Sequence, residues 1–173
     1  MADIKVKYPA TDTTALTISL ASLANDSTNK LAGRQSTVVD NTSNLDLDHL
    51  LSGLIKMGTS PTAGNTVEVW AFAHHKIVTG TYTYPDTLGA SDAAVTLTST
   101  NVKNVALRLV AVFTVDATTG RNFYIAPTSI AQLFGGSLPQ KWGIFVVNAS
   151  GVALDSTGGN HEFHYQRIQG QTV

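Results

Sequence analysis

The chain has 173 residues, and its 11 Lys and Arg residues against 12 Asp and Glu residues give a formal net charge of −1. Charged residues make up 13% of the sequence, about half the share found in an ordinary globular domain. The 43% hydrophobic content excludes an ordinary disordered chain, and the lack of a basic excess argues against nucleic acid or an anionic membrane as a partner. There is no cysteine, which excludes disulfides, thiolate nucleophiles and thiolate-bound metals.

The length is that of one domain. Residues 1–12 lack the apolar core of a secretory leader, and no stretch approaches the 18 apolar residues of a membrane-spanning helix. We therefore expect a soluble protein with an N-terminal arm at 1–12 and a single domain at 13–173. Within this domain, residues 74–105 form a long polar excursion. Long connections are usually functional, so we expect this one to meet a partner.

Strands account for most of the expected structure, because the polar residues are mainly Thr, Ser, Asn and Gly rather than Lys and Glu. Residues 15–20 alternate between apolar and polar, which predicts a half-buried strand with Leu16, Ile18 and Leu20 on one face. Residues 67–73 and 142–147 are apolar on both faces, as expected of central strands in a packed sandwich. The sequence thus predicts an all-β, antiparallel β-sandwich.

Two further segments are less regular. Residues 45–57 fit both a strand and a helical stripe, and Gly53 and the all-β context favour the strand. We expect Leu45 and Leu47 to share the face of Leu51 in this strand. Residues 127–135 can hold one short helix, capped by Thr or Ser, with Gly135 just past its end.

Three more predictions concern strands and turns. The apolar residues Leu107, Leu109, Ala111, Phe113 and Val115 predict one face of a strand. The excursion is only weakly periodic except at residues 94–97. Residues 148–151 are typical of a hairpin loop, with Asn and Gly supplying positive φ.

The five histidines allow a metal site as the sharpest hypothesis, but their spacing argues against it. His161 and His164 point to opposite faces of a strand, as do His74 and His75, and the chain has neither a His-x-His pair nor an HExxH motif. We expect no metal. His49 lies on a mostly apolar face and is predicted to be a hydrogen-bonded core histidine, and the other four are predicted to be surface or interface residues.

The sequence contains no recognisable arrangement of catalytic residues. The sequence has no Gly-x-Ser-x-Gly elbow, no phosphate-binding loop and no GxGxxG, and its two glutamates, Glu68 and Glu162, do not suggest a paired-carboxylate site. The Asp155-Ser-Thr-Gly stretch is typical of a turn that Asp begins. We therefore expect neither enzymatic activity nor a cofactor.

Aromatic and arm residues are the candidates for interaction. Most aromatics lie in strong strands and are predicted to be core residues: Trp70, Phe72, Trp142 and Phe145. Tyr82 and Tyr84 are predicted to be exposed in the excursion, where they could stack on a sugar or anchor a protein contact. In the arm, Ile4 and Val6 alternate with lysines, a pattern that can add a strand to a neighbour's exposed edge.

Four stretches are informative when they are read together. They are TTALTISLASLA (13–24), AGRQSTVVDNTSNLDLDHLLSG (32–53), GTSPTAGNTVEVWAFA (58–73) and LFGGSLPQKWGIFVVNASGVALDSTGGNHEFHYQ (133–166). Together they resemble a family of virion structural proteins from tailed bacteriophages. The resemblance covers most of the chain and is weakest in the excursion.

The resemblance implies a jelly-roll-like sandwich, with at most one short helix, that acts as a capsid decoration (cement) protein. Such a protein would be made in the bacterial host cytoplasm and would bind the major capsid protein on the outer surface of the virion, with self-association as a dimer or trimer. The low charge suits this role, because the cores of interfaces are depleted of Lys, Glu and Asp. No catalytic residues are implied.

Two other functions remain open. The chain could be a tail, baseplate or fibre component, which differs only in its place in the particle. It could instead be a carbohydrate-binding module that uses Tyr82, Tyr84 and Trp142. A metal-dependent enzyme is a more distant reading.

Overall fold

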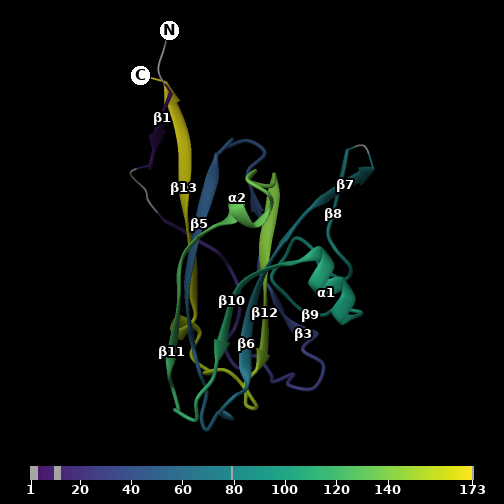
Figure 1. Cartoon of the computed structure of the whole chain (residues 1–173), viewed down its shortest axis with the longest axis vertical. Helices are drawn as coiled ribbons and strands as arrows, with labels where there is room; N and C mark the ends of the chain where they lie inside the picture. The colour runs from purple at the N-terminus through teal and green to yellow at the C-terminus, as the bar shows by residue number, and fades with distance from the viewer. Residues whose placement is uncertain (1–3, 10–12, 79, 173) are drawn as a thin grey trace.

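Two antiparallel sheets packed face to face make up most of the protein (Figure 1). The computed structural model describes residues 4–9, 13–78 and 80–172. The five-stranded sheet runs β1 (Ile4–Lys7), β13 (Glu162–Thr172), β5 (Asp48–Lys56) and β11 (Asn122–Ser129), with β2 (Thr14–Ala15) also pairing with β13. The six-stranded sheet runs β10 (Arg108–Thr114), β6 (Thr66–Ala73), β12 (Lys141–Ala149), β3 (Ala32–Gln35) and β9 (Ala93–Thr96), with β4 (Val39–Asp40) pairing with β12.

The strand order is that of a jelly roll. When β2, β3, β5, β6, β10, β11, β12 and β13 are numbered one to eight along the chain, the two sheets run 1-8-3-6 and 2-7-4-5. Each sheet therefore takes strands from both halves of the chain, as in two wrapped Greek keys. The predicted all-β, jelly-roll-like sandwich is confirmed.

The main core lies between the two sheets and follows the period of two in each strand. In β6, the inward residues Val67, Val69 and Ala71 are fully buried, and β12 contributes Trp142, Ile144 and Val146. The five-stranded sheet faces them with Leu51, Ile55, Ile125 and Phe163. These central strands are the core strands that the sequence predicted.

A second core explains why β6 and β12 are apolar on both faces. Their outward residues Phe72, Phe145 and Val147 are buried under the excursion, where Leu88, Leu97 and Leu107 cover them. The excursion contains β7 (His75–Val78), β8 (Thr81–Thr83), β9 and α1 (Thr100–Ala106). Part of the excursion therefore packs on the outer face of the six-stranded sheet and β9 extends that sheet, so the excursion is not the open polar loop that we expected.

Helix α1 is an addition to the one short helix expected. Ser99 caps it, with its Oγ accepting from Val102 N, and the buried Lys103 holds it against the sheet. Lys103 Nζ lies 3.0 Å from Glu68 Oε2 and donates to Lys30 O at 2.7 Å. Thr100 and Asn101 are weak helix formers, which is why the sequence did not indicate this helix.

The second helix was predicted. Helix α2 (Ile130–Leu133) begins after Ser129, whose Oγ accepts from Gln132 N, and Gly135 follows its end with φ of +81°. No helix among the described residues is long and apolar enough to cross a membrane. A single 3-10 turn, η1 (Gly158–Asn160), completes the helical segments described.

Two predicted strand faces need correction. Of the strand predicted at residues 15–20, only Ala15 lies in a strand, β2 (Thr14–Ala15). The chain then leaves the five-stranded sheet, and Thr17 O accepts a hydrogen bond from Thr37 N near the other sheet. Leu16 and Leu20 are nevertheless buried as predicted. In β10 the register shifts between Leu109 and Ala111, so the predicted single face is divided. Leu107 lies in the second core, Leu109 is exposed, and Ala111, Phe113 and Val115 face the main core.

The ends of two other segments also differ from expectation. Strand β5 begins only at Asp48, and the preceding Leu45 and Leu47 are exposed instead of sharing the face of Leu51. Residues 148–151 turn the chain, but the following residues form no strand, so there is no hairpin. The Asn148 side chain instead donates to Leu23 O and Val152 O and fixes the turn.

Candidate functional site

A two-stranded ribbon projects from one end of the sandwich (Figure 1). It consists of β1 and the last four residues of β13, paired as Ile4 with Thr172, Lys5 with Gln171, Val6 with Gly170 and Lys7 with Gln169. Among the described residues, β1 pairs with no strand except β13. The predicted arm therefore pairs within its own chain here, and its residues 1–3 and 10–12 lie outside the described residues. Addition of the arm to a neighbour stays a prediction.

The ribbon carries an exposed apolar stripe. Ile4 is 77% exposed and Val6 63%, and the alternation places both on one face of the strand. Tyr8, the residue after the strand, is 56% exposed. A Cβ built on Gly170 would lie 3.5 Å from Ile4 Cγ2 and 3.6 Å from Leu47 Cδ1. Side chains from the arm and from Leu47, which precedes β5, therefore flank the bare backbone of Gly170, and most of their apolar surface faces solvent.

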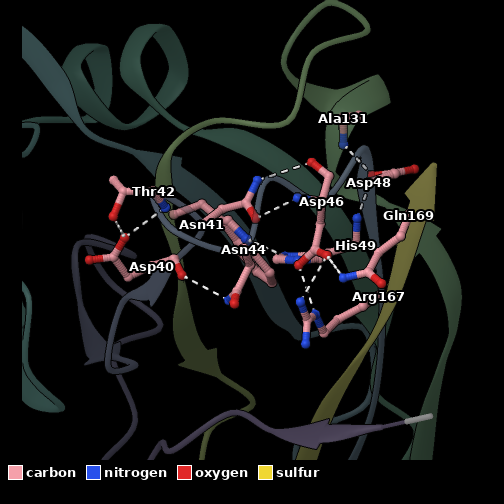
Figure 2. Close-up of polar contacts among 11 residues, drawn as sticks. Asp40, Asn41, Thr42, Asn44, Asp46, Asp48, His49, Ala131, Arg167 and Gln169 are labelled. Carbon is pink, nitrogen blue, oxygen red and sulfur yellow. Dashed lines mark hydrogen bonds and ion pairs between the residues drawn. The ribbon is translucent and has the colours of Figure 1, made fainter. Parts of the chain in front are cut away.

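A buried carboxylate fixes the base of the ribbon (Figure 2). Asp46 accepts from Arg167 at 2.8 and 3.0 Å and from Gln169 Nε2 at 2.7 Å, and both donors belong to β13. The backbone of Asp46 is held in turn, because Asp46 N donates to Asn41 Oδ1 and Asn41 Nδ2 donates to Asp46 O. Asp46 thus joins the loop before β5 to the root of the ribbon.

The fourth hydrogen bond to the Asp46 carboxylate comes from His49. Its Nε2 lies 3.0 Å from Asp46 Oδ2, and its Nδ1 accepts from Trp142 Nε1 at 2.9 Å. An indole nitrogen can only donate, so Nδ1 is unprotonated and His49 is neutral in this arrangement. The prediction of a hydrogen-bonded core histidine is confirmed, since His49 is buried and both ring nitrogens are bonded.

The ionisation of the network follows from its surroundings. Burial lowers the pKa of His49, despite the neighbouring Asp46 carboxylate. For Asp46, burial alone would raise the pKa, but the hydrogen bonds from Arg167, His49 and Gln169 outweigh it and hold the pKa below its ordinary value. The network therefore places a neutral His49 beside the ion pair of Asp46 with Arg167. Both ring nitrogens of His49 are already hydrogen-bonded, so the network serves to position β13.

These pKa directions predict a loss of stability in acid. His49 binds a proton more weakly when folded, so the free energy of unfolding falls as the pH drops below the unfolded histidine pKa of about 6.5. Asp46 adds a second loss below about pH 4. We expect urea unfolding between pH 7.5 and 5 to show the first loss in the wild type and in His164→Gln, and to show little of it in His49→Gln. A free energy of unfolding that stays constant over this pH range in the wild type would contradict the lowered pKa of His49.

The two excursion tyrosines are not freely exposed as predicted. Tyr82 is half-buried, and its ring lies under Lys141 Nζ at 4.4 Å, while Lys141 also pairs with Asp40 at 2.8 Å. Tyr84 is half-buried and packs edge-on against Phe72 in the second core. The structure does not bring these tyrosines to the ribbon residues Ile4 and Val6. They hold the excursion against the sheet, because each packs on a residue of β6 or β12.

The remaining candidates are placed as follows. Trp142 is fully buried, so it cannot stack on a sugar at the surface. His161 is buried rather than at the surface, with Nε2 2.9 Å from Asp155 O. Among the described residues, no group of three or more His, Asp or Glu is arranged to hold a metal ion.

The sequence indicated part of this site. It identified Ile4 and Val6 by their alternation with lysines, and the same alternation extends to Tyr8. It missed Asp46, Arg167 and Gln169, because they are brought together by the pairing of β5 with β13 across more than 100 residues of chain, as the separation of 121 between Asp46 and Arg167 shows.

Comparison with known proteins adds no relative. No family model, no curated protein and no solved structure matches this chain.

Proposed function

We propose that this chain is a structural protein of a tailed-bacteriophage particle, a decoration protein that binds the major capsid protein on the outer surface of the head. The observation that carries the proposal is the ribbon, which stands clear of the sandwich and exposes Ile4 and Val6 on the paired strand and Tyr8 just after it. Contiguous exposed apolar surface marks interaction sites. The family resemblance of residues 133–166 supplies the class of partner.

Two further features support a role in a repeated assembly. The jelly roll is an architecture used by viral capsid domains, although fold alone does not establish function. Charged residues make up 13% of the chain, and uncharged Thr, Ser and Asn can be buried against a neighbour at a lower desolvation cost than Lys or Glu. Many copies on one shell then convert modest contacts into a firmly held layer.

Binding to heads that lack the protein tests the proposal. Purified protein is mixed with expanded heads and sedimented, and we expect saturation at a simple ratio of this chain to the capsid subunit. Ile4→Ser/Val6→Ser is expected to weaken binding at least tenfold, because it removes the apolar stripe. Val105→Ser, which changes another exposed apolar residue, serves as the matched control and should bind as the wild type does. Absence of saturable binding by the wild type would overturn the proposal.

A further inference from the structure

We propose that β1 is exchanged between copies of this chain, so that residues 4–7 of one copy pair with residues 169–172 of another. The partner is therefore a second copy of the protein, and the contact is the same ladder that the structure shows within one chain. This inference concerns the purified protein and does not depend on the capsid placement.

In the described structure, the backbone ladder with β13 is the main contact that holds β1 to its own chain. All four of its residues are exposed, and β13 is the one strand with which β1 pairs in the described structure. The apolar neighbour Leu47 lies at the edge of the ladder, beside Gly170. A ladder of backbone hydrogen bonds forms equally well within or between chains, and an isolated two-stranded ribbon is only marginally stable in water.

The lysines of β1 also favour exchange over edge pairing. The free edge of β1 could instead pair with β1 of another copy, but an antiparallel pairing that keeps the apolar residues on one face must set lysine against lysine. Within Ile4–Lys7, the two such registers that pair three residues place Lys5 opposite Lys5, or Lys5 opposite Lys7. Like charges directly opposite each other destabilise a sheet. Exchange avoids this conflict, because Lys5 faces Gln171 and Lys7 faces Gln169.

The connection between β1 and β2 is longer than pairing within one chain requires. Both strands pair with the same edge of β13, with Lys7 opposite Gln169 and Thr14 opposite Tyr165. Six residues, 8–13, therefore join β1 to β2, whereas three residues, 166–168, separate their partners on β13. Six extended residues reach about 20 Å, roughly twice what that spacing requires. The connection is long enough to carry β1 to a neighbouring copy.

Exchange also explains the exposed stripe. Two exchanged ribbons lie side by side in a closed symmetric pair, so part of the apolar surface of Ile4, Val6 and Tyr8 in each copy is shielded by the other copy, and the rest stays open to the shell. Within one chain these three residues remain more than half exposed. Covering them supplies the free energy that favours exchange over the ladder within one chain.

Single cysteines test the exchange directly, because the natural chain has none. Val6 and Gly170 are opposed in the ladder, and the Cα atoms of opposed residues, about 4.5–5.5 Å apart, suit a disulfide. Val6→Cys and Gly170→Cys are produced as separate variants, refolded together from urea and oxidised. The Gly170 site accepts a Cβ, whose nearest contact would be 3.5 Å.

We expect the mixed disulfide between the two variants to be the main covalent dimer, identified by its mass, and at least tenfold more abundant than the dimer of Val6→Cys with itself. Lys5→Cys mixed with Gly170→Cys is the control, since those positions lie on opposite faces and should not react. A predominant Val6→Cys homodimer would show edge pairing of β1 strands and overturn the exchange.

The double variant Val6→Cys/Gly170→Cys completes the test. If it closes its disulfide within one chain while the mixed single variants give no covalent dimer, β1 stays on its own chain and the exchange is wrong. If neither experiment gives a disulfide, the ladder itself is absent in solution and the inference falls with it. No phage particle is used, so each of these failures leaves the shell-binding proposal to be judged by its own experiment.

Discussion

Replacing Asp46 with alanine is expected to lower the free energy of unfolding by about 3 kcal/mol, the lower end of the range for breaking a buried ion pair. The carboxylate accepts hydrogen bonds from His49, Arg167 and Gln169, and its side chain is fully buried. The loss lies at the lower end because the Arg167 side chain is partly exposed and can regain some hydration. Urea unfolding should show a lower midpoint with an unchanged slope.

A matched control separates this effect from the loss of any ion pair. Asp116 pairs with Arg121 at 2.7 Å, but both side chains are largely exposed, and exposed ion pairs contribute little. Asp116→Ala should therefore leave the urea midpoint unchanged. If the two variants lose the same stability, Asp46 is not the anchor of the ribbon base.

Replacing Phe72 with alanine is expected to cost about 3–5 kcal/mol, as for other large-to-small changes of buried aromatics. Phe72 is fully buried between the six-stranded sheet and the excursion, in contact with the second core and with Tyr84. The cavity would loosen the excursion before the main core. Limited proteolysis should then cut the variant within residues 74–105 at least tenfold faster than the wild type.

Leu109→Ala is the control for this prediction. Leu109 is an apolar residue of the adjacent strand β10 that the register shift leaves exposed, so its truncation should change stability by less than about 0.5 kcal/mol. Equal proteolysis of the wild type and Phe72→Ala would show that the excursion does not depend on the second core.

The regular strands could be predicted from the sequence because their burial repeats with a period of two. This pattern located β5, β6, β10 and β12, and the cap signals located α2. The period of two could not show where a strand changes register or leaves its sheet. The register shift in β10 turned Leu109 outward, and the departure of the chain after Ala15 shortened β2.

Strands that are apolar on both faces carry more information than a central place in a sandwich. One face of an antiparallel sheet is commonly open to water, so a second apolar face needs a cover of its own. The outward residues Phe72 and Phe145 indicated that another segment must cover the six-stranded sheet. Tyr84 belongs to that cover, which is why it was not exposed as predicted.

Only the part of the candidate site that lies within one short segment could be predicted from the sequence. The alternation of Ile4 and Val6 with lysines is visible in four residues of sequence, whereas the network under the ribbon joins Asp46 to β13 and His49 to β12. Such a network depends on which strands become neighbours. The spacing of the residues along the chain does not contain that information.

The central claim is that this chain sits on the outside of a phage head, and labelling of intact virions tests it most directly. Antibodies raised against the purified protein are bound to unbroken particles and located by electron microscopy with gold. We expect gold spread over the whole head surface. Gold confined to the tail, or no labelling of intact particles by antibodies that bind the free protein, would contradict it.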